Sequence, residues 1–341
     1  MSDHLLILPH LRIQNANAIS GPLTWGFPAM TAFIGLMHAL ERRCRQENID
    51  VHFKGVGVVC HQATPQTTRS AYGQHSFQLT RNPLKADGAT AAIVAEGRMH
   101  LELSLLLKMS GTACEDAQSE RCRLAAQIDS YLQDMRIAGG SVLPRTDERL
   151  VHYQRTPVLM PLVPEEDADL YQRQLRSIKR RLLPGFALIL RENALVNRLK
   201  TLQDTQPNAT LLEAWLDLSR FNYRYHPDRP EKQRWALTRQ LSGWLVPIPV
   251  GYSALSDEMP AGAITNARDP NTPLRFVEPL FSIGEWRSPH RFERVDEMLW
   301  RIRPTDDERL FLLDMWEKTA GAIDDDANGL DAEPEQDPND Y

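Results

Sequence analysis

The densest run of cationic side chains in this sequence lies between residues 171 and 191, where no Asp or Glu interrupts it. Arg173, Arg176 and Arg180 are spaced i, i+3 and i+7, so a helix would place them in one row on one face. Such a row can neutralise several phosphates along a nucleic-acid backbone. Blocks of charge also occur on solvated helix faces that bind nothing, and the spacing alone leaves both interpretations open. The run comprises Arg173, Arg176, Lys179, Arg180, Arg181 and Arg191.

A second group of polar side chains follows the first apolar segment of the chain. Residues 5–13 predict a strand, and the loop after it ends at Trp25-Gly26-Phe27-Pro28, directly before an amphipathic helical pattern. Amides and hydroxyls hydrogen-bond base edges or phosphates, and an indole ring stacks on a base. The same residue types also cap and turn loops that have no ligand. The candidates in this loop are Asn15, Asn17, Ser20 and Trp25.

The sequence carries no recognised catalytic or metal-binding motif. A Walker loop, a His-Glu-x-x-His helix and a Gly-x-Ser-x-Gly elbow are absent, and the four cysteines form no Cys-x-x-Cys pair. We therefore expect no metal and no cofactor. One catalytic alternative remains, an RNA endonuclease that needs no metal but places a His or Tyr near the scissile phosphate. Its candidates are His38, His61 and His290.

The elements that must position these groups alternate in a recognisable order within residues 1–145. Apolar residues at helical spacing and β-branched or alternating segments give the order strand, helix, strand, strand, helix, strand. This is the order of the split βαβ fold, so we predict an α+β protein with a ferredoxin-like (RRM-like) βαββαβ core. The expected strands are 5–13, 51–61, 98–107 and 136–143, and the expected helices are 28–45 and 115–135.

Two features interrupt this core. Residues 65–96 are an insertion between the second and third strands, which would project from the sheet edge as an arm carrying Arg81 and Lys85. Gly139 and Gly140 lie in the last strand, where paired glycines either let another backbone approach closely or mark a β-bulge.

The rest of the chain is less regular. We predict a mixed helical and strand region over residues 146–323, with a helix over 169–183 and two late helices over 295–303 and 307–320. Residues 324–341 contain eight acids and no Lys or Arg, a composition typical of a disordered acidic tail. The rest of the chain contains 37 of the 45 acidic residues and all 39 basic ones, so its charge is nearly balanced. Any nucleic-acid binding must therefore come from local patches rather than from net charge.

The chain shows no feature of a membrane or secreted protein. No apolar segment is long enough to cross a bilayer, and no secretory signal pattern is present. We expect a cytoplasmic protein with reduced thiols and no membrane partner.

Several short blocks, taken together, resemble the second subunit of the type I-F Csy surveillance complex, a RAMP-superfamily subunit of CRISPR effector complexes. The first runs through Trp25-Gly26-Phe27-Pro28 into the following helix, and the others are spread as far as residue 291. Any one block is weak evidence, but their number makes the resemblance specific. The further blocks are residues 12–20, 79–84, 138–141, 180–188, 243–249 and 284–291.

The resemblance implies a non-catalytic scaffold that binds the 5′ handle of the CRISPR RNA. It also implies contacts with the large subunit and the backbone subunits of the complex, with target double-stranded DNA near the foot of the complex as a further candidate partner. The insertion would be the family's arm, near the junction of handle and spacer. The alternatives are the RNA endonuclease and a protein-only assembly adaptor. The candidate RNA-binding residues are Asn15, Asn17, Ser20, Trp25, Arg81, Lys85, Gly139, Gly140, Arg173, Arg176, Arg180 and Arg181.

Overall fold

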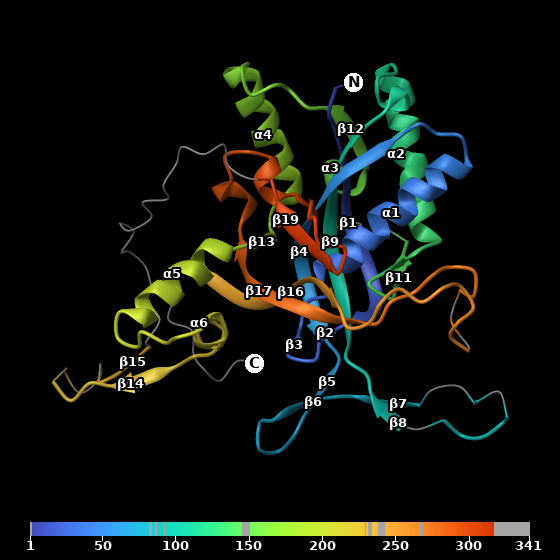
Figure 1. Cartoon of the computed structure of the whole chain (residues 1–341). Helices are drawn as coiled ribbons and strands as arrows, with labels where there is room; N and C mark the ends of the chain where they lie inside the picture. The colour runs from blue at the N-terminus through green and yellow to red at the C-terminus, as the bar shows by residue number, and fades with distance from the viewer. Residues whose placement is uncertain are drawn as a thin grey trace.

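The computed structural model is an α+β protein built on one large antiparallel sheet with helices on both faces (Figure 1), so the α+β class is confirmed. The predicted acidic tail lies outside the described residues, and so does the predicted boundary at residue 145. The structure describes residues 2–81, 84–85, 87–91, 93–144, 151–228, 230, 234–237, 243–265, 267 and 269–316.

Four strands of the N-terminal half lie side by side in the order β11–β1–β9–β4, and all neighbours are antiparallel. The helix α1 lies between β1 and β4 along the chain, and α2 lies between β9 and β11. These elements begin and end close to the residues that the sequence patterns predict. Their bounds are β1 His4–Asn17, α1 Met30–Gln46, β4 His52–Pro65, β9 Arg98–Ser110, α2 Gln118–Gln133 and β11 Gly140–Leu143, with short β2 Ile19–Gly21, β3 Thr24–Trp25, η1 Thr112–Cys114 and β10 Arg136–Ile137 between them.

Both helices of this half bury their apolar side against the same face of the sheet. Phe33 and Leu40 of α1 and Ile128 of α2 are fully buried in one core with Leu8 and Leu105 of the sheet. Arg43 and Arg45 lie in the last turn of α1, where cations interact favourably with the helix dipole.

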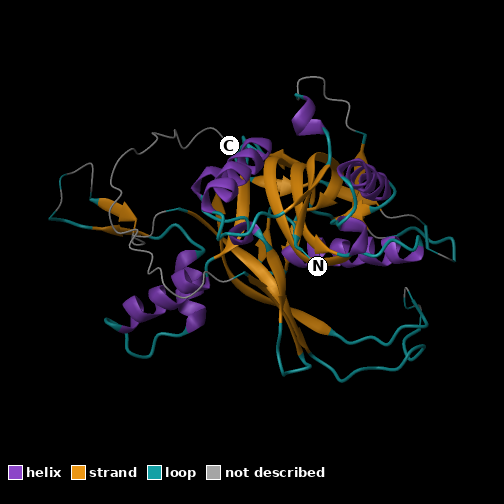
Figure 2. Ribbon diagram, turned by 90° about the horizontal axis from the view of Figure 1, so that it is seen from above, coloured by secondary structure: helices purple, strands orange, loops and turns teal. Residues whose placement is uncertain are grey.

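The strands of the C-terminal region continue the same sheet beyond β4. Together with β4 they form a closed ring in the order β4–β13–β17–β16–β19–β18, because β18 pairs back onto β4 (Figure 2). Trp300 is fully buried, and its indole Nε1 donates a hydrogen bond to the carbonyl of Leu188 at 2.7 Å. The bounds are β13 Phe186–Leu190, β16 Trp244–Ala254, β17 Val277–Arg287, β18 Trp300–Arg303 and β19 Leu310–Met315.

The two late helices predicted over 295–303 and 307–320 are wrong. The described part of these segments contains β18 and β19, preceded by one short 3₁₀ helix, η4 (Asp296–Met298). Pairing with β4 and β16 closes the ring, and this tertiary pairing overrides a helical spacing of apolar residues. The remaining elements are α3 His152–Arg155, β12 Val158–Pro161, α5 Glu192–Gln203, α6 Leu211–Leu218, β14 Tyr223–Tyr225, β15 Trp235–Leu237 and η3 Pro289–Arg291.

The predicted basic helix is confirmed as α4 (Ala168–Leu182) and covers the opposite face of the sheet from α1 and α2. Its buried residues Leu175 and Ile178 pack in a second core with Ile7 and Leu106. The side chain of Asp167 caps its first turn by accepting a hydrogen bond from the N–H of Leu170 at 3.4 Å.

The arm leaves the sheet after β4 and returns into β9. It contains two small antiparallel strand pairs, and Figure 1 shows them projecting beyond the end of the sheet where β2 and β3 lie. The strands are β5 Thr67–Arg69, β6 His75–Phe77, β7 Leu79–Arg81 and β8 Ile93–Ala95.

Candidate nucleic-acid interface

The polar side chains of the first loop hold the loop in shape. Asn15 has a φ of +59° at a bulge of β1, and its Oδ1 accepts a hydrogen bond from Gln66 Nε2 at 2.6 Å. The amide of Asn17 bonds both backbone groups of Ile19, at 2.6 and 3.1 Å. Ser20 Oγ donates to Thr24 Oγ1 at 2.8 Å. Turn formation therefore accounts for the contacts of Asn17 and Ser20, whereas Asn15 ties the loop to Gln66 at the start of the arm.

Trp25 behaves differently, because 61% of its surface is exposed. Its ring meets Phe77 of the arm edge to face, with centroids 5.5 Å apart. The base of the arm also packs closely on the loop, since a Cβ added at Gly97 would lie 2.5 Å from Ile19 Cγ1. The first loop and the arm thus form one continuous surface.

Gly139 and Gly140 lie next to the first loop, and each occupies a position that suits glycine. Ala138 and Gly139 form the turn between β10 and β11 and have φ values of +47° and +79°. Gly140 packs against β1 so closely that a Cβ there would lie 2.6 Å from Ile13 Cγ2. The N–H of Asn17 donates to the carbonyl of Ala138 at 2.8 Å. Asn17, Ser20 and Gly139 consequently line one shallow depression of about 670 Å³.

The arginine row of α4 forms as predicted, with Arg173, Arg176 and Arg180 all exposed and Arg181 half-buried. Figure 1 shows the start of α4 at the end of the molecule away from the first loop and the arm. The structure therefore does not gather all candidates into one site. In the arm, Arg81 lies in β7 and the exposed Lys85 lies in the turn that follows.

A pocket of about 480 Å³, which the sequence patterns do not reveal, lies between the first loop, the end of β4 and the starts of β13 and β16. Successive rings in its wall touch, with centroids 5.8 Å apart for Phe186 and Trp244, 6.2 Å for Trp244 and Trp286, and 4.9 Å for Trp286 and Phe27. We call it the aromatic pocket, after its rings Trp25, Phe27, Phe186, Trp244 and Trp286.

These five rings come from four separate sequence blocks, 25–28, 180–188, 243–249 and 284–291. Each of these blocks contributed to the resemblance to a CRISPR subunit. The four blocks are visible in the sequence, but only the fold shows that they meet at one pocket.

Comparison with known proteins decides the family. The family model described as CRISPR-associated protein (Cas_Csy2) matches residues 6–313, which is nearly the whole chain. The chain belongs to the Csy2 family. CRISPR-associated protein Csy2 of Pseudomonas aeruginosa (strain UCBPP-PA14) is 47% identical over 317 residues, which cover 91% of this chain and 94% of that protein. The resemblance to the second subunit of the type I-F Csy complex is thereby confirmed.

One catalytic candidate of this Csy2-family chain, His61, forms part of the wall of the aromatic pocket. Its Nδ1 donates to the carbonyl of Pro184 at 2.6 Å, and its Nε2 accepts from Ser104 Oγ at 2.7 Å. Burial, together with the stacked imidazole of His10 at 4.0 Å, lowers the pKa of His61 to about 4. The ring is neutral at pH 7 and both nitrogens are engaged within the protein, an arrangement that supports packing rather than proton transfer.

The other two catalytic candidates lie on different elements. His38 is on α1 at the shallow depression beside Asn17, and His290 is in η3, where its Nδ1 lies 2.8 Å from Ser288 Oγ. Among the described residues of this Csy2-family chain, no three His, Cys, Asp or Glu side chains are placed to hold a metal ion. None of the described helices has the length and apolar character needed to cross a bilayer.

Proposed function

We propose that this chain is a non-catalytic scaffold subunit of a type I-F CRISPR surveillance complex and binds the 5′ handle of the CRISPR RNA. The observation that carries the proposal is the row of exposed guanidinium groups on α4 in a chain of the Csy2 family. A row of arginines along one helix face can follow a phosphate backbone. The apolar face of α4 packs in the second core, so the arginine face points away from it.

The RNA would meet two regions of the protein. Arg173, Arg176, Arg180 and Arg181 of α4 would bind phosphates, as would Arg81 and Lys85 of the arm. The first loop and the Gly139-Gly140 hairpin would hold the end of the handle, with Trp25 as the stacking ring. The hydrogen bonds within the loop support this role indirectly, because a loop that is already ordered loses less entropy on binding.

The N-terminal half would be a ferredoxin-like RAMP domain over residues 1–145, with its arm at 65–96. The strand order β11–β1–β9–β4 and the position of α1 and α2 on one face support this assignment. Residues 146–323 would form the second region, and 324–341 a disordered acidic tail.

The large subunit and the backbone subunits would be the protein partners, in the cytoplasm. The projecting β14–β15 pair supports a protein contact, since Tyr223, Tyr225 and Trp235 are 60%, 46% and 65% exposed and protein interfaces are rich in such rings. Target double-stranded DNA near the foot of the complex is a further candidate partner.

A nuclease-protection experiment tests this function. The complex is purified through a tag on this chain, treated with ribonuclease, and the protected RNA is sequenced. Protected fragments that begin with the repeat-derived handle support the proposal. Purified subunits without protected RNA would instead indicate a protein-only adaptor, and cleavage of repeat RNA by the isolated chain would indicate an endonuclease.

A further inference from the structure

The described side chains that line the aromatic pocket are mostly apolar and aromatic. No Lys, Arg, Asp or Glu is among the described residues that line it, and the imidazole in its wall, His61, is neutral at pH 7. Trp25, Trp244 and Phe186 are 61%, 58% and 43% exposed, so their rings are accessible to a ligand. The pocket is therefore suited to a flat, uncharged group.

Cations lie outside the pocket, along the chain that leads into it. Arg180 and Arg181 lie in the last turn of α4, which ends at Leu182, and the chain then passes through residues 183–185 to Phe186 in the pocket wall. Five residues span at most about 18 Å, so the Cα of Arg181 is held within that distance of the Cα of Phe186. A pocket lined by uncharged groups, with cations on the chain that leads into it, fits a single RNA strand, in which uncharged bases alternate with charged phosphates.

The polar groups of the pocket are few and suited to a base edge. Gln62 and Ser20 are among the lining residues. The amide of Gln62 offers a donor and an acceptor, and its hydrogen bond to Thr64 Oγ1 is long at 3.4 Å. Ligand sites are commonly apolar concavities of this size with a small number of polar groups that fix orientation.

We propose that the aromatic pocket is the subsite for one unstacked nucleobase of single-stranded RNA, held against Trp244 and Trp25. The inference rests on the proposed RNA-binding function and specifies how that function reads the handle. Bases of single-stranded RNA are typically splayed out and stacked on aromatic side chains, whereas duplex RNA is not read in this way.

The experiment asks whether one ring of the protein and one base of the RNA contribute to the same contact. Handle RNAs that each carry one abasic nucleotide are titrated against the full chain and against Trp244→Ala. At one RNA position, base removal and Trp244→Ala should each weaken binding roughly 5- to 150-fold. Combining that abasic RNA with Trp244→Ala should weaken binding no more than either change alone. Trp244→Phe should recover most of the affinity, because it restores a stacking ring.

A matched control separates the ring from the pocket. Phe276 is also exposed (54%) but lies outside the pocket, and Phe276→Ala should leave RNA affinity unchanged. Wild-type binding with no abasic position coupled to Trp244 would overturn the pocket assignment and leave the proposed function standing. Loss of the large subunit from Trp244→Ala complexes with unchanged RNA affinity would identify a protein-docking pocket instead. Absence of handle binding by the wild-type chain would overturn both.

Discussion

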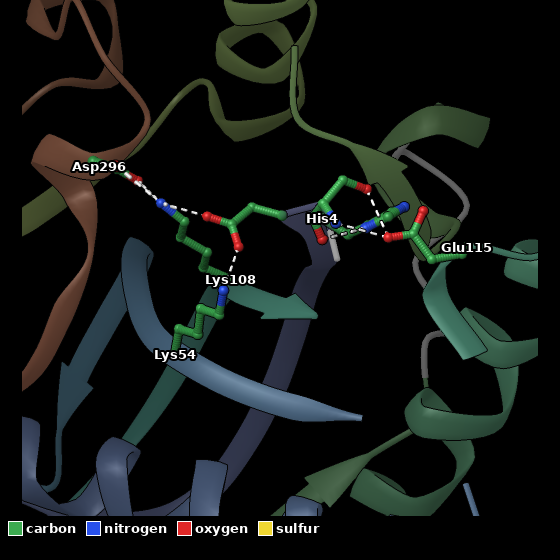
Figure 3. Close-up of polar contacts among 7 residues, drawn as sticks. His4, Lys54, Lys108, Glu115 and Asp296 are labelled. Carbon is green, nitrogen blue, oxygen red and sulfur yellow. Dashed lines mark hydrogen bonds and ion pairs between the residues drawn. The ribbon is translucent and has the colours of Figure 1, made fainter. Parts of the chain in front are cut away.

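Lys108 near the end of β9 and Asp296 in η4 form an ion pair between the two halves of the chain, with Lys108 Nζ 3.0 Å from both carboxylate oxygens (Figure 3). The lysine is only 7% exposed, and its Nζ also lies 3.3 Å from Asp3. Burial opposes ionisation of Asp3, but the hydrogen bond from Lys54 and the charge of Lys108 outweigh it and lower the pKa of that carboxyl. One buried cation thus connects the N-terminal segment, the sheet and the C-terminal region.

Replacing this cation is expected to destabilise the protein. Lys108→Met leaves Asp296 and Asp3 next to an apolar side chain, and we expect a loss of about 2–4 kcal/mol in the free energy of unfolding, because both acids are partly exposed. Urea unfolding followed by circular dichroism measures it. Lys54→Met is the matched control, since the exposed Lys54–Asp3 pair is worth at most about 1 kcal/mol. Equal losses in the two variants would contradict a central role for Lys108.

The lowered pKa of His61 predicts an acid-sensitive stability. Below pH 6.5 the unfolded chain binds a proton on this ring, whereas the folded protein resists it down to about pH 4. Stability is therefore lost as the pH falls from 6.5 to about 4, by up to about 3 kcal/mol for a shift of this size. Melting temperatures across this range measure the effect.

His61→Asn is the comparison, because an amide keeps a donor toward the carbonyl of Pro184 but does not titrate. This variant should be less stable at pH 7, and its melting temperature should change less between pH 6.5 and pH 4 than that of the wild type. An unaltered pH profile would show that other groups cause the acid sensitivity.

Gly140 is expected to tolerate no side chain. A Cβ there would meet Ile13 Cγ2 at 2.6 Å and the backbone N of Ala16 at 2.7 Å, so Gly140→Ala should cost about 1–3 kcal/mol through displacement of β1. Gly35 on α1 is the matched control, because nothing lies within 4 Å of its added Cβ and alanine favours a helix by up to about 1 kcal/mol. Thermal unfolding of both variants gives the comparison, and a stabilising Gly140→Ala would contradict the packing described for β11.

Charge reversal on α4 tests the arginine row. We expect Arg176→Glu with Arg180→Glu to weaken handle binding and to reduce the salt slope by about 1.4, or 0.7 for each lost phosphate contact on a single strand. Filter binding over a series of salt concentrations measures both. Arg123→Glu reverses another exposed helix arginine, on α2, and should change neither. An unchanged slope in the double variant would remove α4 from the RNA site.

The regular part of the fold could be predicted because local patterns decide it. In α1, Phe33, Met37 and Leu40 repeat at helical spacing, and the same residues are buried in the structure. Leu310–Met315 could not be assigned in this way, since its strand conformation also depends on pairing with β16, which lies far earlier in the sequence.

The candidate site was only partly predictable for the same reason. The spacing of Arg173, Arg176 and Arg180 is local, and the exposed row exists. The aromatic pocket brings Trp25 together with Trp244 and Trp286, more than 200 residues later in the chain, and only the sheet order makes them neighbours. The turn contacts of Asn17 and Ser20 also needed coordinates, because an amide in a loop looks the same in sequence whether or not it binds its own backbone.

The most direct test of the central claim is a UV-crosslink map between this chain and the CRISPR RNA in the assembled complex, read by mass spectrometry of the crosslinked peptides. We expect handle nucleotides crosslinked to the peptide that contains Trp25 and to arm and α4 peptides. Crosslinks confined to the arm and absent from the first loop would contradict the proposed site, and the absence of any handle crosslink would contradict the proposed function.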